Sequence, residues 1–287
     1  MAGSTGSGRA EGSRPQAGGR SRLLSLSPLT VLPCSPVEQI DAAEAAGFDA
    51  VDLRLVPVLD TDVDVIGDPA LRRAIARRLQ ESGMQVLGVE VVRIGPATDV
   101  RALEPMLDYA AEVGARCMTV TAPAKADWKP GDEPATVRRL ADLCELAAAR
   151  GIRPMIEFMA FRGIATLEDA IRVVRSVDHP NLGICLDALH LMRSGGSPAA
   201  VAGMDGRMLA CLQLCDAPAV PPADLPREAR YDRLYPGEGA LPLRELIRAV
   251  PAALSIGLEA PGVTYGGLAP LERARRIMAG TRALLNG

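Results

Sequence analysis

Residues 150–157, Arg-Gly-Ile-Arg-Pro-Met-Ile-Glu, contain the pattern from which the fold can be predicted. An amphipathic stretch rich in Ala, Leu and Arg ends at Gly151, and a short apolar run then leads to Glu157. Glycine easily adopts the left-handed conformation that follows the last turn of many helices. A short aliphatic run without polar alternation is typical of a buried parallel strand. The stretch therefore predicts a helix, a tight turn and a strand that ends in a carboxylate.

The same order of helix, glycine and strand recurs along the chain. Gly47, Gly83, Gly114 and Gly151 are separated by 36, 31 and 37 residues, each the length of one βα unit. The repeat predicts strands near residues 24–29, 49–54, 85–92, 116–121, 153–158, 182–187, 208–214 and 253–259. It predicts helices near residues 36–46, 68–82, 99–113, 133–150, 166–177, 197–203, 241–249 and 268–284, with Pro36, Pro69 and Pro270 at helix starts.

Eight such units over residues 23–287 match a single (β/α)8 TIM barrel of the α/β class in number and size. The competing architecture is a doubly wound open sheet, but no GxGxxG turn supports it. Residues 1–22 are rich in Gly, Ser, Arg and Ala and hold too little apolar surface to order themselves. We expect a disordered tail there, or an artefact of the choice of start site.

Composition excludes several classes of protein. A net charge of −3 leaves no electrostatic footprint for nucleic acid or anionic lipid. No run of 18 apolar residues is present to span a membrane, and the tail lacks the apolar segment of a signal peptide. The six cysteines form no CxxC pair and the chain has only two histidines, so a Cys/His zinc site is hard to assemble. We expect reduced thiols in a cytoplasmic protein.

Four predicted strands end in an oxygen-bearing side chain, namely Glu157, Asp187, Gln213 and Glu259. The carboxyl ends of barrel strands meet at one rim, so these groups are directed at one place, as a hard cation requires. The all-oxygen set favours Mg²⁺ or Mn²⁺ over Zn²⁺, with Co²⁺ a further candidate. The alternatives are that a strand-end carboxylate only caps the next helix, or that Gln213 is a satisfied core amide.

The motifs around these residues are Ile156-Glu157, Leu186-Asp187-Ala-Leu-His190, Leu212-Gln213-Leu-Cys-Asp216, Pro236-Gly-Glu-Gly239 and Leu258-Glu259. As an ordered set at strand ends, they resemble the xylose isomerase-like TIM barrels, the sugar phosphate isomerase/epimerase group. The resemblance covers about residues 23–287. It implies that Glu157, Asp187, Gln213 and Glu259 bind one divalent metal ion. It also implies that Glu157 and Glu259 are catalytic and move protons on opposite sides of a bound keto compound.

Gln213 makes the resemblance to some branches of this group stronger than to others, because many epimerases of the group carry His at the corresponding place. Gln there is similar to the hydroxypyruvate isomerases and the 3-dehydroshikimate dehydratases, and residues 212–218 and 236–242 are more similar to the dehydratases. We predict a metal-dependent sugar or sugar phosphate isomerase or epimerase that forms an enolate from a small polyhydroxylated keto compound. The alternative is a dehydratase, a carbon–oxygen lyase in which the same enolate expels water.

Further residues are predicted to bind the substrate. His190 would face the pocket with Asp187 and hold a substrate oxygen, and Arg54 and Glu90 lie near strand ends on the same rim. The segment from Asp216 to Ala240 is predicted to be a long lid or binding loop, and its Arg233 is a candidate clamp for a carboxylate or phosphate.

Two further residues are predicted to have other roles. His179 precedes a strand and is predicted to be structural, at the end of the barrel away from the site. Trp128 either walls the pocket or covers a helix end.

The sequence disfavours two functions outside this chemistry. DNA-repair nucleases that share this barrel need a three-metal cluster with several histidines, which two histidines and a net negative charge disfavour. A barrel that keeps the fold without catalysis would be expected to lack a ligand, whereas all four positions carry oxygen donors. The predicted partner is a small keto sugar or keto acid, with no nucleic acid and no membrane, and homo-oligomerisation stays open.

Overall fold

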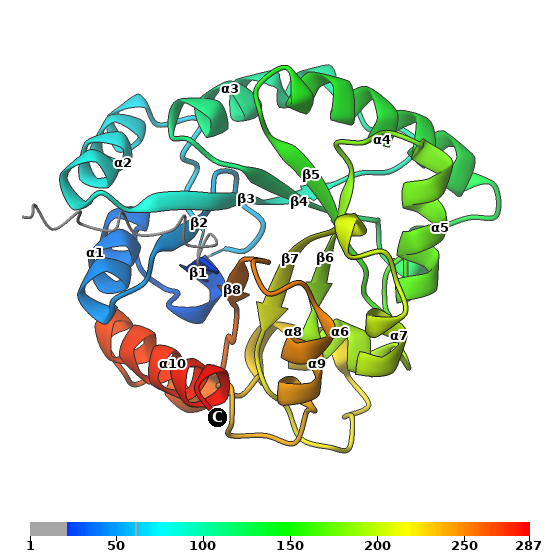
Figure 1. Ribbon diagram of the computed structural model, residues 1–287. Coiled ribbons are helices and arrows are strands. Elements are labelled where there is room, and N and C mark those ends of the chain that lie inside the picture. The colour runs from blue at the N-terminus through cyan, green and yellow to red at the C-terminus, as the bar shows by residue number, and fades with distance from the viewer. Residues whose placement is uncertain (1–21, 61) are drawn as a thin grey trace, which may run out of the picture.

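The computed structural model describes residues 22–60 and 62–287. Eight parallel strands form a closed barrel in the order of the sequence, and helices lie around it in an outer ring (Figure 1). The predicted TIM barrel is therefore confirmed. The predicted tail lies outside the described residues except for Arg22, whose guanidinium donates to the carbonyl oxygens of Pro251 and Ala252 at 2.9 and 3.1 Å.

The strands are β1 (Leu24–Leu26), β2 (Ala50–Arg54), β3 (Gln85–Arg93), β4 (Cys117–Thr121), β5 (Arg153–Glu157), β6 (Gly183–Asp187), β7 (Leu209–Leu214) and β8 (Ile256–Leu258). The α-helices are α1 (Pro36–Ala46), α2 (Pro69–Ser82), α3 (Glu104–Glu112), α4 (Asp132–Ala148), α5 (Leu167–Val177), α6 (Ala188–Arg193), α7 (Pro198–Ala202), α8 (Leu225–Tyr231), α9 (Leu243–Ala249) and α10 (Pro270–Leu285). Short 3-10 turns cover Pro28–Thr30, Arg101–Leu103, Lys125–Asp127, Gly206–Met208 and Val263–Tyr265.

The glycines of the sequence repeat occupy the turns for which they were predicted. Gly47, Gly83, Gly114 and Gly151 have φ values of 78°, 69°, 75° and 71°, the left-handed region that L side chains rarely adopt. Each follows a helix and precedes a strand by two or three residues. The repeat therefore predicted the turn geometry as well as the order of the elements.

The inside of the barrel is filled by a small cluster made up of Ala50, Leu87, Cys117, Met155, Cys185 and Cys211. Because side chains alternate along a strand, a residue two positions further on faces the same side, one layer nearer the carboxyl ends. Asp52, Glu157, Asp187 and Gln213 stand two residues beyond members of this cluster. Strand alternation therefore directs these polar groups into the barrel mouth. The larger hydrophobic core lies between the strands and the outer helices.

The structure differs from the predicted elements at three places. Strand β1 ends at Leu26 because Pro28 begins a 3-10 turn, whereas the strand was predicted to reach residue 29. The segment 216–240 was predicted to lack structure of its own, but it contains α8, capped by Asp224, whose side chain accepts from Arg227 N at 3.0 Å. Helix α6 begins directly after Asp187 and was not predicted.

Asp216 anchors both ends of the loop that contains α8. Its Oδ1 accepts hydrogen bonds from the backbone N–H groups of Ala217 and Leu241, both at 2.9 Å, and its Oδ2 accepts from Gly237 at 3.0 Å. A Cβ atom at Gly239 would lie 2.3 Å from Asp216 Oδ1, so no larger residue fits there. The motif Pro236-Gly-Glu-Gly239 is thus explained by the close approach of the backbone to a buried carboxylate.

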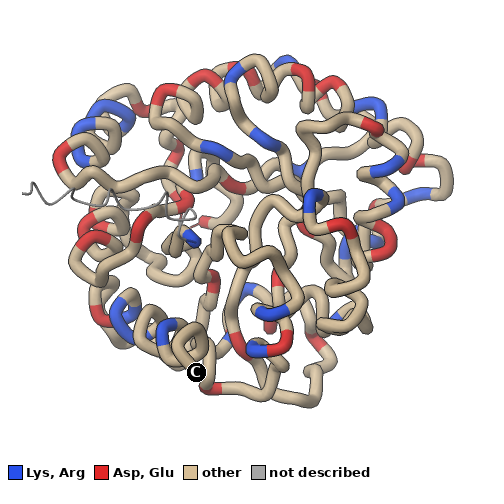
Figure 2. Tube along the Cα trace, viewed as in Figure 1, with Lys and Arg blue, Asp and Glu red and all other residues tan. Residues whose placement is uncertain are grey.

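Charged residues of both signs are mixed over the outer helices and do not gather on one face in this view (Figure 2). Among the described residues, no helix is both long and apolar enough to cross a membrane.

We expect the exchange Asp216→Asn to lower the free energy of unfolding by about 1–3 kcal/mol, because an amide NH₂ would face a backbone N–H and leave it without an acceptor. Urea unfolding measures the effect. The control is Asp224→Asn at the start of α8, where Asn caps a helix about as well as Asp. Equal stability of the two variants would contradict the anchoring role of Asp216.

Candidate active site

A pocket opens at the carboxyl ends of the strands, with free space of about 660 Å³ including its open mouth. Part of this space is open solvent at the mouth of the barrel. It is lined by Leu29, Arg54, Val58, Leu59, Glu90, Val91, Arg93, Thr119, Thr121, Glu157, Met159, Phe161, Arg162, His190, Gln213, Ala229, Arg230, Arg233 and Glu259. All of the predicted site residues except Asp187 are in this lining, and Asp187 contacts two of its members directly.

Asp187 is the last residue of β6 and also the N-cap of α6. Its Oδ1 accepts a hydrogen bond from the backbone N–H of His190 at 2.9 Å, which fixes the first turn of the helix. His190 thereby faces the pocket, with Nε2 lying 3.8 Å from Glu157 Oε1. Ligand atoms of Glu157, Asp187 and His190 lie within 4.8 Å of one another, so these three could hold a metal ion. Asp187 therefore caps a helix, the alternative given above, and also lies beside the other predicted ligands.

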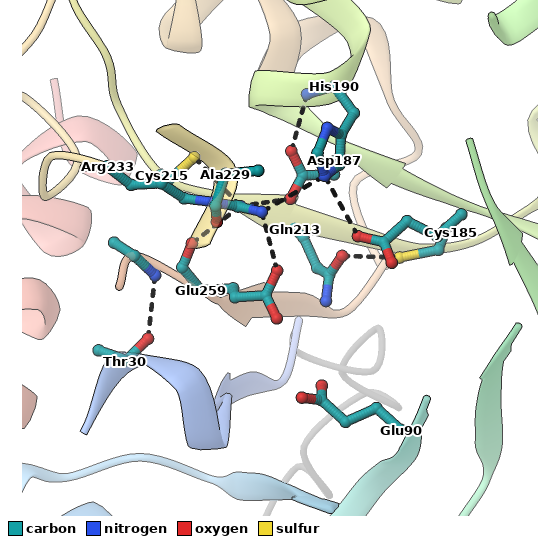
Figure 3. A network of polar contacts seen from close by, with 12 residues as sticks. Thr30, Glu90, Cys185, Asp187, His190, Gln213, Cys215, Ala229, Arg233 and Glu259 are labelled. Carbon is teal, nitrogen blue, oxygen red and sulfur yellow. Dashed lines mark hydrogen bonds and ion pairs between the residues drawn. The ribbon is translucent and has the colours of Figure 1, made fainter. Parts of the chain in front are cut away.

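Arg233 reaches into this cluster from the loop between β7 and α9. Its Nη1 lies 2.6 Å from Asp187 Oδ2 and its Nη2 lies 3.3 Å from Glu259 Oε2. Figure 3 shows the guanidinium between the two carboxylates. Its Nε donates to the carbonyl oxygen of Ala229 at 2.8 Å, and the side chain is buried. Arg233 thus joins two predicted metal ligands that come from different strands.

The cluster holds more negative than positive charge. Burial, together with Glu259 and Asp187, raises the pKa of Glu157 well above its usual value. Burial also raises the pKa of Glu259 to about 8, although Arg233 opposes the shift. For Asp187, Arg233 and His190 outweigh burial and hold the pKa below its usual value. Three carboxyls beside one guanidinium leave two negative charges when all are ionised, which a divalent cation would balance.

Gln213 presents its amide oxygen in the same layer. The thiol of Cys185, on the neighbouring strand, donates to Gln213 Oε1 at 3.0 Å and so fixes the orientation of the amide. A carbonyl-type oxygen has two lone pairs, so one is still free to bind a cation. Together with the charge imbalance, this donor set fits a divalent metal ion. Nothing in the sequence indicated this hydrogen bond from Cys185.

His190 is neutral at neutral pH. Burial lowers its pKa to about 4, although Asp187 raises it. Its Nε2 lies 3.4 Å from Arg233 Nη2, and because arginine can only donate, this contact is a hydrogen bond when the ring proton is on Nδ1.

A second group of charges lies beside the first. Arg54 Nη2 lies 3.0 Å from Glu90 Oε1, and Arg54 Nη1 lies 3.1 Å from Asp62 Oδ2. Asp62 also accepts from the backbone N–H groups of Val58 and Leu59 at 2.9 and 2.8 Å, so Arg54 ties the loop after β2 to the pocket wall. Burial raises the pKa of Glu90 to about 7 although Arg54 lowers it.

Two residues singled out in the sequence lie away from the pocket lining. His179 lies between α5 and β6, at the amino end of that strand, where its Nε2 is 3.3 Å from Glu145 Oε1. Trp128 packs on Gly163, where a Cβ atom would lie 2.2 Å from its ring. The tryptophan therefore supports the loop after β5 and is not part of the pocket lining.

Charged residues that were not predicted include Arg93 and Arg162 of the pocket lining and the buried Asp52. Asp52 could have been found, because it stands two residues before Arg54 on β2 and so faces the same interior. Its Oδ2 accepts from Ser25 Oγ at 2.6 Å. The two arginines gave no signal in the sequence, because arginine is common on the exposed faces of this chain.

A known protein family matches most of this chain. The sequence profile described as Xylose isomerase-like TIM barrel matches residues 40–280. The chain belongs to this family.

Three similar proteins illustrate its range. A 3-dehydroshikimate dehydratase from Pseudomonas aeruginosa is 29% identical over 258 residues, which are 86% of this chain and 39% of that protein. An inosose isomerase from Bacillus subtilis is 28% identical over 106 residues, 36% of this chain and 37% of that protein. The crystal structure of IolI protein with a bound zinc atom superposes with a TM-score of 0.81 at 19% identity, covering 92% of this chain and 98% of that one. The chain spans about two fifths of the length of the dehydratase.

The buried carboxyl of Asp52 should make stability depend on pH. Burial raises its pKa from 3.8 to about 7, so the folded protein binds this proton more tightly than the unfolded chain. That contribution to stability is complete below pH 3.8 and is lost as the pH rises to about 7. We expect Asp52→Asn to remove this loss, so that the variant gains stability relative to the parent across that range. Urea unfolding at several pH values, with a chelator present, measures the difference.

The matched control for this experiment is Asp178→Asn, the same exchange at an exposed carboxyl after α5. A difference between parent and Asp52→Asn that stays constant with pH would show that Asp52 is ionised in the folded protein.

Proposed function

We propose that this protein uses a divalent metal ion to form an enolate from a small polyhydroxylated keto compound. The observation that carries the proposal is the cluster of Glu157, Asp187 and Glu259 in one pocket, partly neutralised by Arg233. Glu157, Asp187, Gln213 and Glu259 would hold the metal, preferably Mg²⁺ or Mn²⁺ because all four donate oxygen. When bound, the metal would polarise the substrate carbonyl and stabilise the enolate oxygen.

Glu157 and Glu259 would transfer the protons. They come from the ends of β5 and β8, which are separated by two strands in the barrel, so they approach a bound molecule from different directions. Glu157 is the proposed base that removes the proton beside the carbonyl, and Glu259 is the proposed acid. Their burial keeps water scarce around the reacting atoms, as enolisation requires.

The neighbouring residues would orient the substrate and the acid–base pair. Neutral His190 would donate to or accept from a substrate hydroxyl. Arg233, predicted from the sequence as a substrate clamp, has donors on both Asp187 and Glu259. We therefore assign it the role of holding these carboxylates in place, and the substrate clamp must be sought elsewhere in the pocket.

The enolate has two outcomes, return of a proton in an isomerase or epimerase, or loss of a β-hydroxyl as water in a dehydratase. We favour the dehydratase, because similarity to a 3-dehydroshikimate dehydratase extends over 258 residues, against 106 for an inosose isomerase. Incubation with 3-dehydroshikimate and, separately, with keto sugars separates the outcomes. Elimination produces a conjugated product with a new ultraviolet absorbance, whereas isomerisation of a ketose does not.

The proposed base can be tested by the exchange Glu157→Gln. It keeps an oxygen donor but removes the basic group, so turnover should fall by about 10² or more. Exchange of the substrate C–H with solvent deuterium, followed by NMR, should fall equally, because proton removal is the first step of both outcomes. The control is Glu112→Gln on the exposed side of α3. Normal solvent exchange in Glu157→Gln would show that another group is the base.

The metal site can be tested without any substrate. Titration calorimetry should show one Mn²⁺ bound per chain. Gln213→Leu should weaken that binding by about tenfold or more, because one oxygen donor is lost while the charge stays the same. The control Glu90→Gln changes a pocket carboxyl that is paired with Arg54 and is not a proposed ligand. Unchanged Mn²⁺ affinity in Gln213→Leu would remove Gln213 from the ligand set.

A further inference from the structure

Five arginines line the pocket, and they fall into two groups. Arg54 and Arg233 each make two ion pairs with carboxylates. Arg93, Arg162 and Arg230 make no ion pair with any of the described residues. An unpaired arginine is ordinary where it is exposed, as Arg93 is, but not where it is buried, as Arg162 is.

Arg162 is the most enclosed of the three, with 9% of its surface exposed. Its Nε is buried without a hydrogen-bond partner among the described residues, although the side chain lines the pocket. Burial lowers the pKa of Arg162, and the guanidiniums of Arg93 and Arg230 lower it further. Arg162 therefore lies close enough to Arg93 and to Arg230 to be repelled by both, and Glu157 offsets part of this effect.

The backbone that carries Arg162 is held firmly. The N–H of Arg162 donates to the carbonyl oxygen of Met159 at 2.8 Å, and Gly163 N donates to Pro123 O at 3.0 Å. Lys125 N donates to Phe161 O at 3.0 Å, and the ring of Trp128 lies against Gly163. The position of this buried cation is therefore built into the loop after β5.

We propose that Arg162, assisted by Arg93 and Arg230, forms an anion subsite that binds a carboxylate or phosphate group of the substrate. The three side chains come from the loop after β5, the end of β3 and helix α8, and all three line the same pocket. An anion there would offset the repulsion and accept hydrogen bonds from the guanidinium N–H groups that line the pocket. The inference rests on the proposed function in that the pocket is taken as the substrate site. It narrows the substrate class to anionic keto compounds, in place of neutral keto sugars.

The subsite can be tested by binding alone, on protein that has been stripped of metal and then dialysed free of the chelator, so that neither competes for the anion. Three probes are compared by titration calorimetry: benzoate, inorganic phosphate and benzamide, the last being a neutral analogue of benzoate with nearly the same shape. We expect at least one anion to bind about tenfold or more tightly than benzamide. The anion that binds more tightly identifies carboxylate or phosphate as the recognised group.

Variants assign the binding to these residues. Arg162→Gln should reduce the affinity for the preferred anion to the level of benzamide, and Arg93→Gln should reduce it by a smaller factor. Arg93 is exposed at the end of β3, so its variant serves if Arg162→Gln does not fold. The matched control is Arg73→Gln on the exposed side of α2, which should bind the anion as the parent does.

Two results would overturn the subsite: neither anion binding more tightly than benzamide, or an unchanged affinity in both Arg162→Gln and Arg93→Gln. Either can be distinguished from failure of the proposed mechanism. Loss of solvent exchange in Glu157→Gln with no anion binding would keep the mechanism and remove the subsite. Anion binding that depends on Arg162, with normal exchange in Glu157→Gln, would keep the subsite and remove the base.

Discussion

The ion pairs of Arg233 with Asp187 and Glu259 are the contacts on which the rest of the site depends. Burying three carboxyl groups at the mouth of one barrel is costly, because each loses water and repels the others. A single guanidinium with two carboxylate partners offsets part of that cost and fixes the distance between β6 and β8 at the rim. It also ties the loop after β7 to the strands, since Arg233 belongs to that loop.

The interior of the barrel explains why these groups stand where they do. Small or flexible side chains, such as Ala50, Cys185 and Cys211, fill the layer beneath the rim. Because one residue in two faces inward, the next inward position on β5, β6 and β7 is an acid or an amide. Cys185 adds a specific contact, the hydrogen bond from its thiol to the amide of Gln213. The same alternation that packs the barrel therefore also orients the candidate metal ligands.

Two loops complete the pocket, and each is anchored by a close contact at a glycine. Asp216 holds the ends of the loop that carries α8 and Arg233, and Gly239 leaves room for its carboxylate. Trp128 packs on Gly163 and supports the loop that carries Arg162. The arginines of the site are thus placed by rigid backbone, which keeps charged side chains in fixed positions without requiring each to have a protein partner.

The sequence by itself determined the barrel. Several helices are followed by a glycine and then by an apolar run, and this pattern recurs at the length of one βα unit. It also placed Glu157, Asp187, Gln213 and Glu259 at the rim, because each stands at the end of an apolar strand. It did not determine which arginines are neutralised and which are free, nor that α8 interrupts the long loop. Those features depend on contacts between residues far apart in the chain, such as Arg233 with Asp187 and Trp128 with Gly163. Local sequence patterns report the period and ends of an element, whereas the partner of a charged side chain is decided only when the elements pack together.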